Sequence, residues 1–439
     1  MKKLITALLC AAMLFAAVSC ADPVKPAGTA DSQTTTEGIT STEEVTTADP
    51  DTADSGTTDT PAPVLTDDFD MYLTSFVEKT QTKSYVISPL SFRYALGMLA
   101  AGARGETLEQ MVKGLGDLNE FEELIKQFNS FEEGFNAKLK ADKEQYDNAR
   151  DKTYLTEPKG ALRTADSVWK RSDLDEFLKE YKLRLEMYGA EYFDFTPEDV
   201  IGRVNVWANE KTKGMIPTIL PDDYDVTDLA VVLMNALYYK NSWGIGFSKE
   251  GARPFTTYDG KTVDRDFIIS DVSTLRYYKD DQTELISVPM QNGVDFIIVL
   301  GDVTDLRSKI GKAEYKKATV ELPEFTTETA LDNMELIEFL KSLGITDVFD
   351  KSKADLTGMI ADKDDLYVRD IIQKAKIKLD ETGVEAAAVT AIMINDESCD
   401  PTEPVRFRAD REFRFYICTG KTDWAKTDGI MMFAGRVSE

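Results

Sequence analysis

The residue types that most often carry catalysis are unevenly represented in this sequence. Its 439 residues contain no histidine. Ser-His-Asp triads, Cys-His pairs, imidazole zinc sites and zincin motifs are therefore excluded. The 78 Asp and Glu residues guarantee chance carboxylate pairs, but no motif singles out two of them for acid–base work. Asp362, Asp364 and Asp365 form a cluster that a solvated loop explains. An enzyme of this composition would have to work with carboxylates, lysine, tyrosine or a cofactor, and we predict no metal site.

The charge balance restricts the partners of the chain. There are 51 Lys and Arg residues against 78 Asp and Glu residues, which gives a net charge of −27. Binding to phosphate backbones needs a basic surface that releases counterions. The composition therefore argues against nucleic acid as a partner, and it argues against adsorption of the folded part to an anionic membrane.

The N-terminus has the features of an export signal. Lys2 and Lys3 precede a fifteen-residue apolar stretch from Leu4 to Val18, which is too short for a comfortable membrane span. The following residues complete the run Ala17-Val18-Ser19-Cys20, which resembles a bacterial lipobox. We predict a signal peptide over residues 1–20, with Cys20 as the lipidated residue. An ordinary signal peptide cut near this point is the alternative.

The segment behind the signal has the composition of a stalk. Residues 22–63 contain 12 Thr, nine acids, one Lys and no aromatic residue. Such a segment cannot bury enough apolar surface to offset the entropy lost on ordering. We predict a disordered tether over residues 21–65, which would hold the folded part at the cell surface or envelope after export. The alternative is a linker without an anchor.

The remaining residues, 66–439, have the pattern of one folded domain. Ser88-Pro89 predicts a helix start, with apolar residues up to Ala101 and Gly102 at the end. The pair Thr107 and Gln110 has the spacing of a capping box for a second helix. Residues 230–239 form an apolar run that predicts a central strand. Further patterns predict a hairpin around 291–293, a helix over 331–343, strands over 413–419 and 429–433, a buried Cys418 and an exposed Cys399. Helices gathered early and strands gathered late indicate an α+β fold.

One segment has a strand pattern followed by a very polar loop. From Gly383 onward, alternate residues of a strand would lie on two faces. One face would carry Val384, Ala386, Ala388, Thr390, Ile392 and Ile394, and the other would carry Glu385, Ala387, Val389, Ala391, Met393 and Asn395. Its small residues could enter a narrow gap between existing strands. An ordinary helix is the alternative, because Glu-Ala-Ala-Ala has good helix propensity. No proline occurs in this segment before Pro401.

Taken together, these blocks resemble the serpin family of protease inhibitors. The resemblance rests on the hinge Glu381-Thr-Gly383-Val384-Glu385-Ala386-Ala387-Ala388-Val389-Thr390, on Ser88-Pro89-Leu90-Ser91, on Leu233-Met-Asn235-Ala-Leu-Tyr-Tyr-Lys240 with Trp243, on Leu322-Pro-Glu-Phe325, and on Gly435-Arg-Val437. These blocks occur in the family's order along about 374 residues. The chain is identified on this basis as a bacterial lipoprotein-type member of the family.

The resemblance implies a fold and a mechanism. The fold would have three β-sheets, eight or nine helices and an exposed reactive-centre loop. A target protease of the serine type, or a cysteine protease, would attack this loop as a substrate. The hinge would then insert into the central sheet and trap the covalent acyl-enzyme. The residues implied at the shutter and breach of that sheet are Ser88, Pro89, Ser91, Asn235, Trp243 and Gln373.

This chain departs from the family at Gln373. The family usually has histidine there, and an amide cannot titrate, which argues against a pH-sensitive shutter.

The position of the reactive bond also follows from the resemblance. Family spacing from Gly383 puts the bond at Glu397–Ser398, with Asp396–Glu397 as the alternative. Either choice predicts a target protease with a basic specificity pocket.

Two rival functions are also open at this stage. One is a non-inhibitory, surface-tethered binding protein with the same fold, and the other is a tethered hydrolase that uses paired carboxylates. The resemblance itself implies a monomer that is not an enzyme and uses no cofactor.

Overall fold

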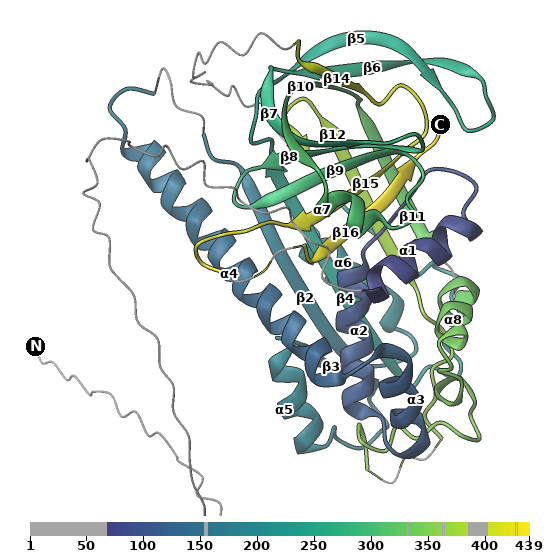
Figure 1. Cartoon of the computed structure of the whole chain (residues 1–439). Helices are drawn as coiled ribbons and strands as arrows, with labels where there is room; N and C mark the ends of the chain where they lie inside the picture. The colour runs from purple at the N-terminus through teal and green to yellow at the C-terminus, as the bar shows by residue number, and fades with distance from the viewer. Residues whose placement is uncertain are drawn as a thin grey trace, which may run out of the picture. The chain divides into compact units, whose positions relative to one another are not determined.

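The computed structural model describes residues 68–152, 157–331, 333–361, 363, 365–384, 403–425, 427 and 429–439. Most of the helices come early in the chain, as predicted (Figure 1). The α-helices of the described residues are α1 (Asp68–Thr80), α2 (Pro89–Gly102), α3 (Gly105–Leu115), α4 (Leu118–Asn148), α5 (Lys179–Met187), α6 (Val200–Lys211), α7 (Leu306–Gly311) and α8 (Asn333–Ser342). A short 3₁₀ helix, η1, covers Asp347–Phe349.

The predicted start of α2 is confirmed. Ser88 is the N-cap, and its hydroxyl oxygen accepts a hydrogen bond from the Ser91 N–H at 3.1 Å. Pro89 opens the helix, where a missing N–H costs nothing. The helix ends at Gly102, and most of its residues are buried. The sequence signals at both ends therefore describe α2 correctly.

The capping box predicted at Thr107 and Gln110 is wrong. Helix α3 begins at Gly105, so Thr107 lies inside its first turn. The Thr107 hydroxyl instead accepts the Asp355 N–H at 2.9 Å. The Gln110 side-chain oxygen accepts the N–H groups of Thr346 and Asp347, each at 2.9 Å, at the start of η1. Both polar groups satisfy donors from a distant segment, which local spacing could not reveal.

The larger sheet has ten strands and spans the upper part of Figure 1. Its strand order is β1-β16-β15-β9-β8-β7-β10-β6-β5, with β14 paired to β10. Strand β10 pairs with β7 through one half and with β6 and β14 through the other, so two groups of strands become one hydrogen-bonded sheet. Its members are β1 (Tyr85–Ile87), β5 (Phe247–Thr256), β6 (Thr262–Ser270), β7 (Ser273–Lys279), β8 (Thr283–Met290), β9 (Val294–Gly301), β10 (Glu314–Pro323), β14 (Val405–Arg408), β15 (Phe413–Thr419) and β16 (Met431–Val437).

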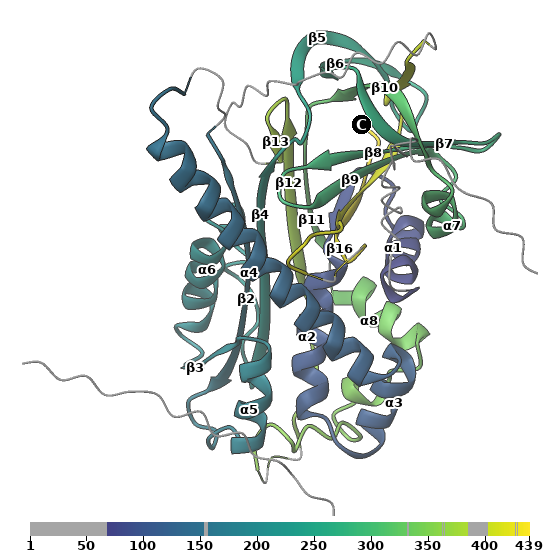
Figure 2. The same cartoon turned by 60° about the vertical axis from the view of Figure 1, so that its left-hand side comes forward.

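The smaller sheet has six strands and contains the predicted central strand. Its order is β11-β12-β13-β4-β2-β3. The strands are β2 (Gly160–Arg171), β3 (Glu191–Phe195), β4 (Val231–Ser242), β11 (Phe325–Leu331), β12 (Gln373–Asp380) and β13 (Gly383–Val384). Helices α6 and α2 lie on opposite sides of β4 in Figure 2. Alternate side chains of β4 therefore enter two different apolar clusters: Leu237 and Tyr239 pack into the main core, whereas Met234 and Ala236 pack with Trp207 of α6.

The remaining element predictions are largely confirmed. Strands β8 and β9 form the predicted hairpin, and the backbone at Asn292 and Gly293 has positive φ of 57° and 70°, as the tight turn requires. The helix predicted from residue 331 begins later, because Leu331 is the last residue of β11. Cys418 is fully buried, as predicted. Cys399 lies outside the described residues.

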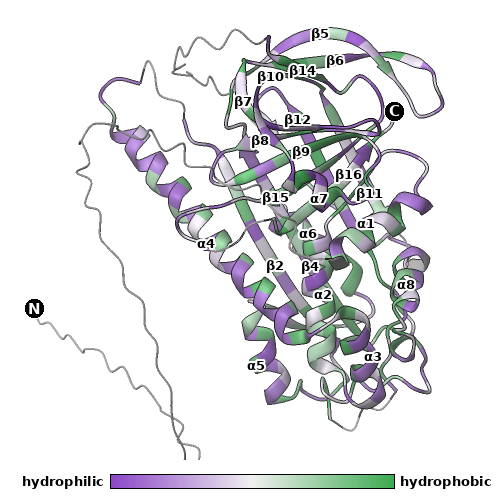
Figure 3. Ribbon diagram, viewed as in Figure 1, coloured by the Kyte–Doolittle hydropathy of each residue, from purple (hydrophilic) through white to green (hydrophobic). Residues whose placement is uncertain are grey.

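Helix α4 is the longest helix, with 31 residues. Its first half is buried through Phe121, Phe128, Phe131 and Phe135. The hydropathy colouring of Figure 3 shows that its far half is mainly hydrophilic. The part of α4 that contributes to the core therefore runs from its start to Phe135, with Leu139 packed partly buried against the same core.

Candidate functional site

The predicted hinge begins between two strands of the six-stranded sheet. Strand β13 is antiparallel to both neighbours, with Val384 opposite Leu379 of β12 and opposite Asn241 of β4. Gly383 has φ of 140°, and a Cβ there would lie 2.1 Å from the Asn241 carbonyl oxygen. Only glycine fits this position. The entry point of the hinge therefore depends on Gly383 for both its torsion angle and its close approach to β4.

Trp243 lies beside this entry point. Its indole N–H donates to the Asp380 carbonyl oxygen at 3.0 Å, and its backbone N–H donates to the Thr382 carbonyl oxygen at 3.3 Å. Its ring packs against Phe247, with 4.7 Å between the ring centroids. The Glu381 carboxylate is 3.5 Å from the Lys249 ammonium group of β5. These contacts fix the turn that leads from β12 into β13.

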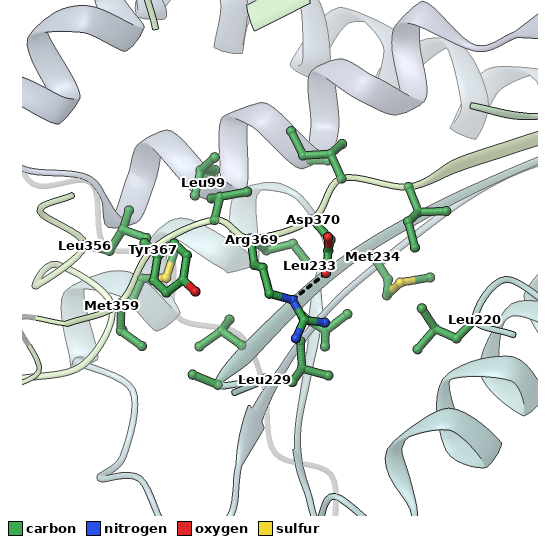
Figure 4. Close-up of a pocket in the computed structure, with 18 of the residues that line it drawn as sticks. Leu99, Leu220, Leu229, Leu233, Met234, Leu356, Met359, Tyr367, Arg369 and Asp370 are labelled. Atoms are coloured by element: carbon green, nitrogen blue, oxygen red, sulfur yellow. Dashed lines mark hydrogen bonds and ion pairs between the residues drawn. The ribbon is translucent and has the colours of Figure 1, made fainter. Parts of the chain in front are cut away.

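Below β13 the sheet is open. Among the residues that the structure describes, β4 and β12 share no register with each other and are joined only through β13. A cavity of about 230 Å³ lies at the lower end of this gap (Figure 4). It is lined by residues 231–235 of β4, by residues 365–374 and by the side chains of α2. The α6–β4 connector (residues 212–230) contributes Ile219, Leu220, Tyr224 and residues 228–230. The lining is completed by Arg171, Lys351, Leu356, Met359 and Lys363.

The predicted shutter residues come together between the cavity and the hinge. The Gln373 amide donates to the Ser88 carbonyl oxygen at 2.9 Å and accepts the Ser88 N–H at 3.2 Å. The Ser88 hydroxyl donates to the Met432 carbonyl oxygen at 2.8 Å. The Ser91 hydroxyl donates to the side-chain oxygen of Asn235 on β4. The start of helix α2 is therefore hydrogen-bonded to both β12 and β4, the two edges of the gap. At the β12 edge, Gln373 acts both as a donor and as an acceptor.

The hydrogen-bond chain continues to a carboxyl group that sequence reasoning missed. The Asn235 amide donates to Asp166 of β2 at 2.7 Å, and Asp166 is 2% exposed. Burial raises the pKa of Asp166 well above its usual value, the Asn235 hydrogen bond opposes this shift, and Glu132 adds to it. The interpretation that the shutter lacks a titratable group is therefore corrected. The available signal was an acid between Ala165 and Ser167, shortly before the apolar residues Val168 and Trp169 of the same strand.

The Asp166 carboxyl should make stability depend on pH. Because its folded-state pKa is raised, its contribution is fully present below the unfolded pKa of about 3.9 and is lost as pH rises through the folded pKa. Asp166→Asn keeps an acceptor for Asn235 but cannot ionise. We expect the variant to melt several degrees above the unchanged protein at pH 8, and at the same temperature or lower at pH 4.

Thermal melts from pH 4 to pH 8 check this expectation. Asp175→Asn, which removes an exposed acid, is the control. Glu132 of α4, Tyr94 of α2 and Tyr188 after α5 also interact with Asp166, and the pKa of each is raised mainly by burial. All three groups are retained in both variants. Identical pH profiles for the Asp166 and Asp175 variants would show that Asp166 does not titrate in this way.

Several predicted site residues cannot be located. Three groups lie outside the described residues: most of the hinge, the reactive bond and the predicted lipidation site. They comprise the hinge residues Glu385, Ala386, Ala387, Ala388, Val389 and Thr390, the reactive-bond residues Asp396, Glu397 and Ser398, and Cys20. Asp362 and Asp364 lie outside them as well. The described part of the chain contains no group of three or more residues that could hold a metal ion. Within the same part, no helix is both long and apolar enough to span a bilayer.

These features define a class of protein: a mixed α+β domain in which the two-residue strand β13 separates β12 from β4 in the six-stranded sheet. Comparison with protein-family models gives the same result, because the model described as serpin (serine protease inhibitor) matches residues 65–439. The chain belongs to the serpin family. The predicted fold class is confirmed, and the strands expected in three sheets are joined here into two hydrogen-bonded sheets.

The chain is similar to several animal proteins. The chain is 30% identical over 369 residues to the leukocyte elastase inhibitor of Equus caballus, which covers 77% of this chain and 90% of that protein. It is 29% identical over 391 residues to serpin B8 of Homo sapiens, covering 82% and 94%. Among solved structures, Serpin48 of the insect Tenebrio molitor, described as a highly specific serpin, matches with a TM-score of 0.65 and 27% identity, covering 84% of this chain and 96% of the other.

Proposed function

We propose that this protein inhibits a protease by acting as a suicide substrate. The nucleophile of the protease attacks the carbonyl carbon of the reactive bond, and the bond breaks with release of a protonated amine from the following residue. The N-terminal side of the loop stays attached to the protease as an ester or thioester. The hinge then inserts below β13 as a full strand, and the protease is carried away before water can hydrolyse the acyl bond. The membership of the family and its inhibitory relatives support this function.

The register of β13 is the observation that carries the proposal. Continued along both neighbours, it would bring Thr390 between Asn235 and Gln373, the two amides of the shutter. It would bring Ala388 between Leu237 and Ala375, and Ile392 between Leu233 and Ile371. Val384 already faces the core and is 1% exposed. The small and branched residues of the hinge would therefore face the core throughout.

The opposite face of the hinge matches its neighbours in charge. The same register would set Glu385 between Lys240 of β4 and Lys378 of β12. The side chains of both lysines point away from the main core, since Lys378 is exposed and Lys240 is half-buried. A carboxylate between two ammonium groups is favourable across a sheet. The only charge of the hinge below Gly383 would thus be paired in the inserted state.

The proposal includes an acidic specificity. The scissile bond would be Glu397–Ser398, or Asp396–Glu397 one residue earlier. In both cases the residue before the bond carries a carboxylate, which requires a basic pocket in the protease. A glutamyl- or aspartyl-cleaving serine protease has the required chemistry, and so has a cysteine protease with the same preference.

A glutamyl endopeptidase of the serine type tests this function. We expect incubation with the full chain to give a complex that survives denaturing electrophoresis, together with a C-terminal fragment beginning at Ser398 or Glu397. Mass analysis of the fragment identifies the bond. Glu397→Gln together with Asp396→Asn should lower the rate of complex formation at least about tenfold, because it removes the charge that the pocket recognises. Absence of both the complex and a cut between Asp396 and Ser398 would refute the acidic specificity.

The proposal also covers location. Export through the signal of residues 1–20 and lipidation of Cys20 would tether a monomeric inhibitor to the cell surface or envelope, with membrane contact only through the lipid. Its support is the lipobox-like run Ala17-Val18-Ser19-Cys20 and the polar composition behind it. A chain that stays wholly in the aqueous phase of a detergent partition, when isolated from an exporting bacterial host, would contradict the anchor.

A further inference from the structure

The side chain of Arg369 crosses the cavity below the shutter. Its backbone belongs to the segment that leads into β12, and in Figure 4 the guanidinium group points into the cavity toward Leu229. One terminal nitrogen donates to the Asp225 carbonyl oxygen of the α6–β4 connector at 2.6 Å. The Nε atom donates to the Asp370 carboxylate at 2.6 Å. Arg369 therefore bridges the β12 side of the cavity and the connector.

Tyr224 strengthens the same bridge from the connector. Its hydroxyl donates to the Asp370 carboxylate at 2.6 Å, and the Arg369 guanidinium lies 5.3 Å from the centroid of its ring. Burial and the hydrogen bond to Asp370 raise the pKa of Tyr224 to about 12, so the phenol keeps its proton and remains a donor. Two hydrogen bonds thus join the connector to the segment before β12: the one from Arg369 to the Asp225 carbonyl oxygen and the one from Tyr224 to the Asp370 carboxylate. Both are charge-assisted, and the bond from Arg369 to Asp370 within the segment orients the two charged groups.

The bridge lies where the inserting strand would end. Continuing the register of β13 brings Ile394 between Arg369 and Val231, and Met393 between Asp370 and Val232. Ile392 precedes this row and meets only Leu233 and Ile371. The apolar side chain of Ile394 and the guanidinium group of Arg369 would therefore compete for the same part of the cavity.

We propose that the Arg369 side chain blocks the insertion path and must leave the cavity before Met393 and Ile394 can enter. The inference rests on the proposed function. It adds a positioning residue that controls how far insertion proceeds. In the uncleaved protein the Arg369 side chain keeps the loop out of the lower cavity. After cleavage it sets the rate of the final step, because the bonds to Asp225 and Asp370 must break before that step.

Two synthetic peptides separate the final step from the earlier ones. One has the sequence of residues 385–394 and reaches the row of Arg369, and the other has the sequence of residues 385–392 and stops before it. Each carries a fluorophore, and its entry into the full-length protein is followed by fluorescence anisotropy. We expect Arg369→Ala to accelerate entry of the longer peptide about tenfold, the effect of losing charge-assisted hydrogen bonds. Entry of the shorter peptide should change less than twofold.

The controls distinguish this inference from the function on which it rests. Arg150→Ala removes one exposed positive charge and should leave both rates unchanged. Tyr224→Phe and Arg369→Lys weaken the bridge with little change of volume and should accelerate only the longer peptide, by a smaller factor, even if Arg369→Ala fails to fold. An equal acceleration of both peptides, or of neither when both enter, would overturn the role of Arg369. Failure of both peptides to enter any variant, together with no gain in stability after loop cleavage, would overturn the proposed function itself.

Discussion

Replacing Ala388 by arginine is expected to convert the protein from an inhibitor of its target protease into a substrate. In the inserted strand, residue 388 would face the core between Leu237 and Ala375, which are 9% and 4% exposed. An arginine there would be buried without a carboxylate, at a cost of about 3–5 kcal/mol. Insertion would slow, and the acyl-enzyme would be hydrolysed first. We expect the fraction of protease trapped per cleavage to fall at least about a hundredfold.

The matched control places the same arginine one residue away. Ala387→Arg would point to the opposite face, beside Lys376, whose side chain is 28% exposed and reaches Glu328 at 2.9 Å. There the guanidinium can extend to solvent, and the trapped fraction should fall no more than a few fold. Titration of active protease with each variant, followed by denaturing electrophoresis, measures complex and cleaved product together. Equal losses at residues 387 and 388 would contradict the inserted register.

Cleavage of the reactive loop is expected to raise the melting temperature of the protein by more than about 10 °C. About ten inserted residues, each gaining roughly 0.5–1.5 kcal/mol from strand hydrogen bonds, give on the order of 10 kcal/mol. For a domain of this size each kcal/mol is worth at least about 1 °C. The gap below β13 and the cavity at its lower end are the space that the strand would occupy. Calorimetry before and after limited proteolysis measures the difference.

The Ala388→Arg variant is the control for this measurement too. It should be cut at the same bond but gain little stability, because its hinge cannot complete the strand. If the unchanged protein gains no stability on cleavage, the sheet does not accept its hinge. The non-inhibitory binding function would then be the better description of this protein.

Much of the fold could be predicted because its signals are local. The Ser88 cap, the turn at Asn292 and Gly293 and the apolar run of β4 each depend on neighbours within a few residues, so spacing alone revealed them. The order of the motifs along the chain was sufficient to identify the family. The same local reasoning failed at Thr107 and Gln110, whose side chains cap distant segments. A side-chain amide or hydroxyl can form hydrogen bonds of similar energy with many different backbone groups. The spacing of residues along the sequence does not show which of these groups is the partner.

The candidate site also has features that the sequence predicts and features that only the tertiary structure reveals. By itself, the sequence determined the alternation of the hinge and the need for glycine before it, because these depend on side-chain size and on strand geometry. Only the tertiary structure decided that Asp166 completes the shutter and that Arg369 crosses the cavity. Asp166 acquires its partner when β2 pairs with β4, and Arg369 when the connector folds across the gap. Burial and charge pairing arise from elements that meet in space, so their effects do not exist in the unfolded chain.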